Sequence, residues 1–206
     1  LERSSDGAGY RLELCHIGYF KALMESLGAD EETQEEIRRN IEQKNFASLN
    51  DLLEQFPNNP AAAALKYLPR LFGGEEVFEQ AYALFDDKNA RESLDYLRNI
   101  YNSLQQLGLG DKVIIDLGLV NQAEYYTGII FRGYFDAVGE PVLSGGRYDN
   151  LLNDFGTDLP AIGFAVNVDL ASSIAEKHPP MTADVLVMAA DDTYLVKTIQ
   201  YLKQLI

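Results

Sequence analysis

The feature that most constrains this fold is a change in hydrophobic period close to residue 110. Between about Glu31 and Leu107, apolar residues recur at helical spacing, and prolines divide the stretch into short helices. After Gly108 and Gly110 the chain changes to β-branched and aromatic runs of strand length. A strand at residues 10–17 precedes the helices. The pattern predicts an α+β fold, in which an antiparallel sheet is flanked by helices.

Local patterns set the expected boundaries of the elements. The helix after the first strand ends at Gly28, as a C-cap glycine would end it. Asn89 with Glu92 has the spacing of a capping box, which predicts the start of the helix that ends near Leu107. The elements expected beyond residue 110 are a strand at 113–119, a hairpin of 126–138 with 142–143, a helix at 147–155, a buried strand at 162–168 and a helix at 170–176.

Two domains are expected, with the boundary at the Pro179-Pro180 pair. Residues 1–178 form the first and include the helical segment 30–107. Residues 179–206 read as one β-α unit, the start of a C-terminal α/β domain that is too short to fold alone. The chain opens on Leu1 rather than methionine, which indicates a fragment of a longer protein.

The charge of the chain argues against a nucleic-acid binder. There are 32 acidic and 17 basic residues, a formal net charge of −15. Phosphate backbones are bound by clustered lysine and arginine, whereas the basic pair Arg38-Arg39 lies among glutamates. No apolar run approaches the roughly 20 residues that span a bilayer, and no signal peptide opens the chain. We therefore expect a soluble, cytoplasmic protein.

Residues that could perform catalysis are scarce. A single cysteine, Cys15, excludes an internal disulfide and a CxxC zinc site. Its neighbour His16 points to the opposite face of the same strand, so the two cannot form a nucleophile and base pair. The other histidine, His178, lies in the linker before two prolines, and no P-loop is present. We expect no metal and no cofactor.

Two stretches nevertheless predict a site for a small polar ligand. Residues 124–131 carry the paired tyrosines Tyr125 and Tyr126 at the entrance to a long strand. Residues 143–151 carry Gly145 and Gly146, which allow close approach of a ligand to the backbone just before the expected helix. Tyrosines on a strand offer an apolar ring and a polar tip, which suit such a pocket.

These stretches resemble the catalytic core of the histidyl-tRNA synthetase family, a class II aminoacyl-tRNA synthetase core. That family carries R-G-L-D-Y-Y-x-x-T-V-F-E, then G-G-R-Y-D-G-L, then G-F-A-x-G-x-E-R. The chain has corresponding stretches in the same order at residues 121–132, 145–151 and 163–170. The resemblance covers about residues 111–176. It implies a partial class II core with a helical insertion, lacking the N-terminal part of that core.

The chain departs from the family where two arginines stand. In the synthetases these arginines contact the reacting carboxylate and phosphate and bind ATP, whereas this chain has Asn121 and Leu170. Losing one such cation typically costs several kcal/mol of transition-state stabilisation, so the resemblance implies no adenylation. Glu124 replaces the family's aspartate, and Arg132 stands where the synthetases have glutamate.

A synthetase core that keeps the amino-acid pocket without ATP chemistry resembles the regulatory subunits of ATP phosphoribosyltransferase. That resemblance implies a non-catalytic subunit that the short catalytic subunit needs for activity and that bears on histidine feedback in histidine biosynthesis. It also implies a homodimer through the core inside a hetero-oligomer. The residues expected to contact histidine are Glu124, Tyr125, Tyr126, Ser144, Gly145, Gly146, Arg147 and Tyr148.

Other interpretations stay open. A catalytically active histidyl-tRNA synthetase fragment would need Asn121 and Leu170 to be compensated elsewhere. An unrelated α+β interaction domain could share these motifs by chance. For Arg147, Tyr148 and Asp149, the alternative is a structural role in which they cap the following helix and hold it against the sheet.

Overall fold

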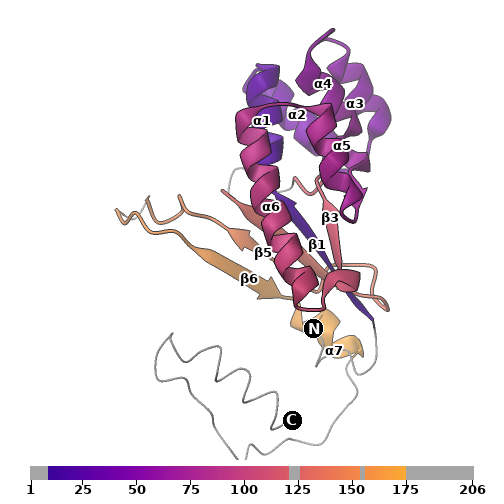
Figure 1. Cartoon of the computed structure of the whole chain (residues 1–206), viewed down its shortest axis with the longest axis vertical. Helices are drawn as coiled ribbons and strands as arrows, with labels where there is room; N and C mark the ends of the chain where they lie inside the picture. Colours follow the sequence, from indigo (N-terminus) through magenta and orange to yellow (C-terminus); the bar gives the residue numbers. More distant parts are fainter. Residues whose placement is uncertain (1–8, 121–125, 154–155, 175–206) are drawn as a thin grey trace, which may run out of the picture. The chain divides into compact units, whose positions relative to one another are not determined.

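The structure, a computed structural model, describes residues 9–120, 126–153 and 156–174. All of them belong to one compact unit, residues 1–175 (Figure 1). The expected domain boundary after residue 178 lies outside the described residues and stays a prediction.

A six-stranded sheet forms the centre of this unit, with the strand order β2-β3-β1-β4-β5-β6. The strands are β1 (Tyr10–His16), β2 (Phe72–Gly73), β3 (Val113–Asp116), β4 (Ile129–Phe135), β5 (Leu143–Arg147) and β6 (Ile162–Val166). Neighbours are antiparallel except β1 and β3, which are parallel because the whole helical segment connects them as a crossover. The predicted α+β fold and the hairpin of β4 with β5 are confirmed, and the sheet is mixed.

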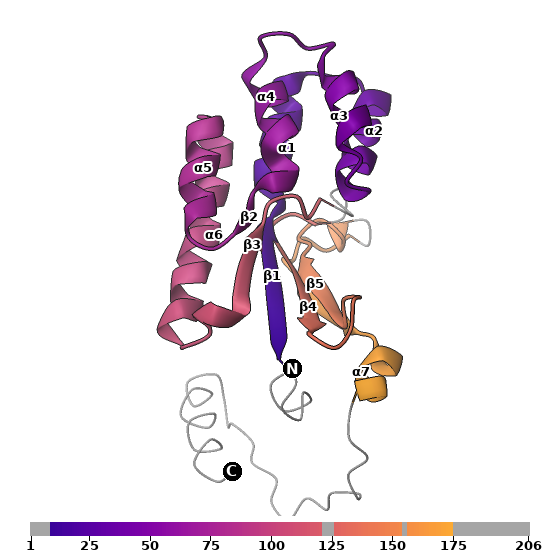
Figure 2. The ribbon, with the colours of Figure 1, turned by 90° about the vertical axis from the view of Figure 1, so that its right-hand side faces the viewer.

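The predicted helical segment is also confirmed. Its helices are α1 (Ile17–Leu27), α2 (Glu31–Glu42), α3 (Phe46–Leu53), α4 (Pro60–Tyr67), α5 (Glu76–Leu84) and α6 (Lys88–Gln106), and α7 (Val168–Ile174) follows β6. Helices α1 to α4 gather at one end of the sheet, while α6 runs along one of its faces (Figures 1 and 2). Gly28 ends α1 in the left-handed region with φ 68°, as expected of a C-cap glycine.

The predicted start of α6 at Asn89 was wrong by two residues. The N-cap of α6 is Asp87, whose carboxylate accepts a hydrogen bond from the Ala90 amide at 3.0 Å. Asp87 is extended, with φ −126° and ψ 147°, and the helix has already begun when the chain reaches Asn89.

Two predictions beyond residue 140 were also wrong. The helix expected at 147–155 does not begin at Arg147, because Arg147 ends β5 opposite Ile162 and the Tyr148 amide donates to the Ala161 carbonyl at 2.8 Å. Residues 149–152 form turns instead. The strand expected to be buried, β6, is exposed, with Phe164 at 71% of its maximum, because β6 lies at the edge of the sheet. The glycine pair therefore lies within a strand rather than before a helix.

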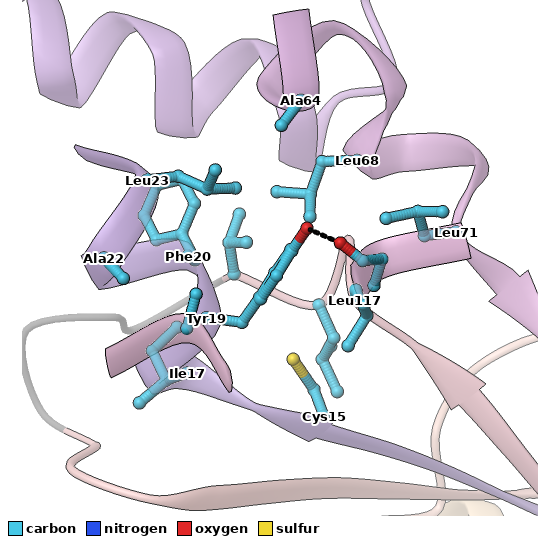
Figure 3. Packing of buried hydrophobic residues seen from close by; sticks show 14 of the residues in the cluster. Cys15, Ile17, Tyr19, Phe20, Ala22, Leu23, Ala64, Leu68, Leu71 and Leu117 are labelled. Carbon is cyan, nitrogen blue, oxygen red and sulfur yellow. Dashed lines mark hydrogen bonds between the residues drawn. The ribbon is translucent and has the colours of Figure 1, made fainter. Parts of the chain in front are cut away.

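The core lies where the first turns of α1 meet the sheet and the other helices (Figure 3). Tyr19 is 1% exposed, and its hydroxyl donates to the Ala81 carbonyl of α5 at 3.1 Å. Cys15 of β1 and Leu68 pack in the same cluster. This packing fixes β1 and α1, and therefore the strands that carry the candidate site.

Candidate functional site

The ring of Tyr126 lies directly on the backbone of β5. Gly146 pairs with Ile130 of β4 on one side and with Gly163 of β6 on the other. A Cβ atom on Gly146 would come within 2.8 Å of two Tyr126 ring carbons and 2.5 Å of the Ile129 carbonyl oxygen. Such distances are too short for any side chain, so only glycine allows this contact.

The backbone of Tyr126 is held in place by its neighbours. Its carbonyl accepts a hydrogen bond from the Lys21 ammonium of α1 at 2.7 Å. The next residue, Thr127, donates its amide to the Arg147 carbonyl at 2.8 Å. The ring of Tyr126 therefore enters the site from a backbone that two elements fix.

Tyr126 and Tyr148 line a surface cavity of about 540 Å³ over strands β5 and β6. Their ring centroids lie 6.4 Å apart with the planes inclined by 54°. The other lining residues are Ser144, Gly145, Gly163, Phe164 and Ala165. The structure thus brings together four of the residues expected to contact histidine, namely Tyr126, Ser144, Gly145 and Tyr148, while their binding of histidine stays a prediction.

A smaller cavity of about 150 Å³ shares Tyr126, Ser144 and Gly145 with the first, and Arg132 also lines it. The two neighbouring cavities therefore have tyrosines on one side and Arg132 on the other. A planar ring and a negatively charged group suit these two sides.

Arg132 belongs to a polar group on one face of the sheet. Its direct partner on β1 is Glu13, so the charge reversal at position 132 faces an acid across the strands. Asp116 of β3 lies on the same face, because residues alternate between faces and Ile114 pairs with Glu13. Burial, and then Glu13, raise the pKa of Tyr134, whereas Arg132 lowers it. Sequence reasoning missed Glu13 and Asp116, although Asp116 is the one polar residue of β3.

Burial, with a smaller contribution from Glu13, raises the pKa of Asp116 from 3.8 to about 6. A carboxyl whose folded pKa is raised stabilises the fold below its unfolded pKa, and that stability is lost as the pH rises through the folded value. We expect the free energy of unfolding to fall by about 3 kcal/mol, relative to Asp116→Asn, over that range. The asparagine oxygen can still accept from the Gly118 amide, which lies 2.9 Å from the carboxylate.

Urea denaturation of the two proteins in parallel at several pH values measures this difference. Comparison with the asparagine variant cancels the contribution of all other titrating groups to the pH dependence of the free energy of unfolding. If the free energies of unfolding of the two proteins differed by the same amount at every pH, the Asp116 carboxyl would have an ordinary pKa.

Arg147 and Asp149 lie away from the tyrosine cavity. Strand alternation places Arg147 on the face opposite Ser144 and Gly146. Its guanidinium donates from Nε to the Asp149 carboxylate at 2.9 Å, and the Asp149 amide donates to the Thr127 hydroxyl at 3.0 Å. These contacts hold the turn after β5 against Thr127. They are structural contacts, but they are not the expected helix cap, because residues 149–152 form turns.

Cys15 and His16 have structural positions, on opposite faces of β1 as expected. Cys15 is buried, and burial raises the pKa of its thiol. His16 is the N-cap of α1, and its Nδ1 accepts from the Gly18 amide at 3.1 Å. Burial lowers the pKa of His16 to about 4, so the ring is neutral at pH 7. Within residues 9–120, 126–153 and 156–174, no cluster of three or more potential metal ligands occurs.

The remaining candidates are placed only in part. Asn121, Glu124 and Tyr125 lie outside the described residues, and their roles stay predictions. Leu170 lies in the first turn of α7, where its amide donates to the Asn167 side chain at 3.1 Å. Its side chain brings no positive charge to that position. Among the helices that the structure describes, none is long and apolar enough to cross a membrane.

Comparison with known proteins supports the resemblance and extends it to the N-terminal part of the chain. The family model of histidyl-tRNA synthetase matches residues 1–170. The chain belongs to the histidyl-tRNA synthetase family. The match covers both the helical segment and the strands of the candidate site, so the class II core that the motifs predicted is confirmed.

Curated relatives within this family are ATP phosphoribosyltransferase regulatory subunits. That of Clostridium botulinum is 38% identical over 203 residues, covering 95% of this chain and 48% of the relative. That of Clostridium kluyveri is 44% identical over 163 residues, covering 78% of this chain and 42% of the relative. This synthetase-family chain therefore spans about half the length of the curated relatives it matches, and the predicted resemblance to the regulatory subunits is confirmed.

A solved structure agrees with the family assignment. The crystal structure of an ATP phosphoribosyltransferase regulatory subunit/histidyl-tRNA synthetase from Bacillus halodurans is 30% identical, with a TM-score of 0.75. The match covers 83% of this chain and 45% of that protein.

Proposed function

We propose that the full-length protein containing this chain is a non-catalytic regulatory subunit of ATP phosphoribosyltransferase. The observation that carries the proposal is the name shared by its relatives at 38% and 44% identity. Leu170 agrees with it, because an uncharged side chain stands where the synthetases have an ATP-binding arginine. An adenylating site needs fixed cations around the phosphates.

The proposed partner is the short form of the phosphoribosyltransferase, in a cytoplasmic hetero-oligomer that also contains a homodimer of the synthetase-like core. Nucleic acid is not a proposed partner, since the chain carries a formal net charge of −15. The full-length protein raises the activity of the short catalytic subunit and transmits inhibition by histidine.

Histidine is the proposed effector, and the cavity at Tyr126 and Tyr148 is its proposed site. The cavity offers aromatic rings, the Ser144 hydroxyl and close approach to the backbone at Gly145. To regulate, histidine needs only to bind one arrangement of the assembly better than another. A typical coupling of about 1–3 kcal/mol changes the partner's properties by roughly 5- to 150-fold.

Two assays on the full-length protein test this function. Mixing it with a short phosphoribosyltransferase is expected to raise that enzyme's activity by about tenfold, which corresponds to about 1.4 kcal/mol. Incubation with histidine, ATP and labelled pyrophosphate is expected to give no exchange of label into ATP. Robust exchange would instead support the catalytically active histidyl-tRNA synthetase, and failure to stimulate the transferase would contradict the regulatory role.

A further inference from the structure

Three polar side chains form a row across the strands beside the tyrosine cavity. Arg132 of β4 has Glu13 of β1 as its partner on one side and Ser144 of β5 on the other. Directly paired residues share a face of the sheet, and neighbouring strands lie about 4.8 Å apart. Arg132 and Ser144 line the same small cavity. The row therefore presents an acid, a cation and a hydroxyl in that order.

The aromatic end of the site lies two residues further along β5. Ser144 and Gly146 share a face, and the ring of Tyr126 covers Gly146. A rise of about 3.3 Å per residue places the ring roughly 6.6 Å from the polar row. Tyr126 and Ser144 line both cavities, so the two cavities are neighbours.

The arrangement matches a zwitterion joined to a planar ring through a short linker. An α-amino acid with a ring on its β-carbon carries its ammonium and carboxylate on one carbon and its ring a few ångströms away. Arginine binds a carboxylate through two parallel hydrogen bonds, and a carboxylate such as that of Glu13 accepts from an ammonium. The paired opposite charges keep the row close to neutral, as a zwitterionic ligand requires.

We propose that Arg132 binds the α-carboxylate of the effector and Glu13 its α-ammonium, while Tyr126 and Tyr148 hold the ring. This inference rests on the proposed histidine site and adds the residues that orient the ligand in it. Tyr134 and Asp116 interact electrostatically with Arg132 from the same face. Glu13 and Arg132 determine that only a complete amino acid binds tightly.

Calorimetry of the full-length protein with histidine and two analogues tests the proposal. Histamine lacks the carboxylate and imidazolepropionate lacks the ammonium. Truncating one partner of a hydrogen-bonded charge pair weakens binding by about 30-fold or more, so histamine is expected to bind that much more weakly than histidine. Arg132→Gln is expected to weaken the binding of histidine by a similar factor and to leave the affinity for histamine unchanged. Glu13→Gln is expected to weaken the binding of histidine and to leave the affinity for imidazolepropionate unchanged.

Matched variants separate recognition from folding. Arg132→Lys keeps the charge and is expected to recover part of the histidine affinity. Arg91→Gln removes an arginine of α6 whose half-exposed side chain pairs with Asp86, and is expected to change neither affinity. An equal loss for histidine and histamine in Arg132→Gln would show that Arg132 is structural and would overturn the inference.

The outcomes also separate this inference from the proposed function. Histidine binding by the wild type that is unaffected in Arg132→Gln would overturn the role of Arg132 and leave the histidine site standing. Equal affinities of the wild type for histidine and histamine would also overturn the role of Arg132 and leave the histidine site standing. No heat with histidine at all would overturn both.

Discussion

Replacing Gly146 by alanine is expected to abolish measurable histidine binding and to lower the free energy of unfolding by about 1–3 kcal/mol. The added Cβ would lie 2.5 Å from the Ile129 carbonyl oxygen and 2.8 Å from the ring of Tyr126. The carbonyl belongs to the neighbouring strand and cannot withdraw, so the ring must leave or β5 must shift. Either change removes one wall of the cavity. Urea denaturation and histidine calorimetry of the full-length variant measure the two effects.

Gly139 provides a matched control for that substitution. It lies between β4 and β5, and a Cβ built on it meets no atom within 4 Å. Its φ is not positive, so alanine fits its backbone. Gly139→Ala is therefore expected to leave both stability and histidine binding close to those of the wild type. Equal behaviour of Gly146→Ala and Gly139→Ala would mean that Tyr126 does not rest on β5.

Local sequence patterns were sufficient to predict the helical segment, the α1 cap at Gly28 and the hairpin of β4 with β5. Each of these depends on neighbours in the chain, such as helical spacing or a glycine that adopts a positive φ. The parallel pairing of β1 with β3 could not be predicted in this way, because almost a hundred residues separate the two strands. The pairing of β6 with β5 likewise overrode the expected helix at 147–155.

The candidate site was predictable to the extent that its residues belong to recognisable motifs. Tyr126, Gly145 and Tyr148 stood in such motifs, with Ser144 directly before one of them, and the structure gathers these residues around one cavity. Glu13 stood more than a hundred residues away in a strand without a motif. Only the register of β1 against β4 places it opposite Arg132, and nothing local in the sequence encodes that register.

Burial within the site was the least predictable property. The sequence at residues 162–168 was predicted to form a buried strand, yet Ile162, Phe164 and Val166 are exposed at the edge of the sheet. Apolar alternation shows which face a strand can bury, whereas the layer that packs over the sheet decides whether that face is covered.

Tyr126→Ala is expected to raise the histidine concentration needed for half-maximal inhibition of the assembled phosphoribosyltransferase by roughly 30- to 100-fold. Tyr126 is 9% exposed, and its ring lines the cavity together with that of Tyr148. Removing the contact surface of such a ring costs about 2–3 kcal/mol, which corresponds to that loss of affinity. The backbone is expected to keep its path, because Lys21 still donates to the carbonyl of residue 126.

Tyr67→Ala is the matched control, since Tyr67 lies on α4 with 52% of its surface exposed and contacts Arg70 rather than the cavity. Inhibition curves of the complex, measured for both variants at fixed substrate concentrations, provide the comparison. A curve for Tyr126→Ala that overlies that of Tyr67→Ala would place the effector site elsewhere. A shift confined to Tyr126→Ala would mean that the synthetase pocket still binds its amino acid. Histidine would then act there as an effector that shifts the partner's equilibrium. It would not be activated by ATP, because the side chain at position 170 carries no charge to bind a nucleotide.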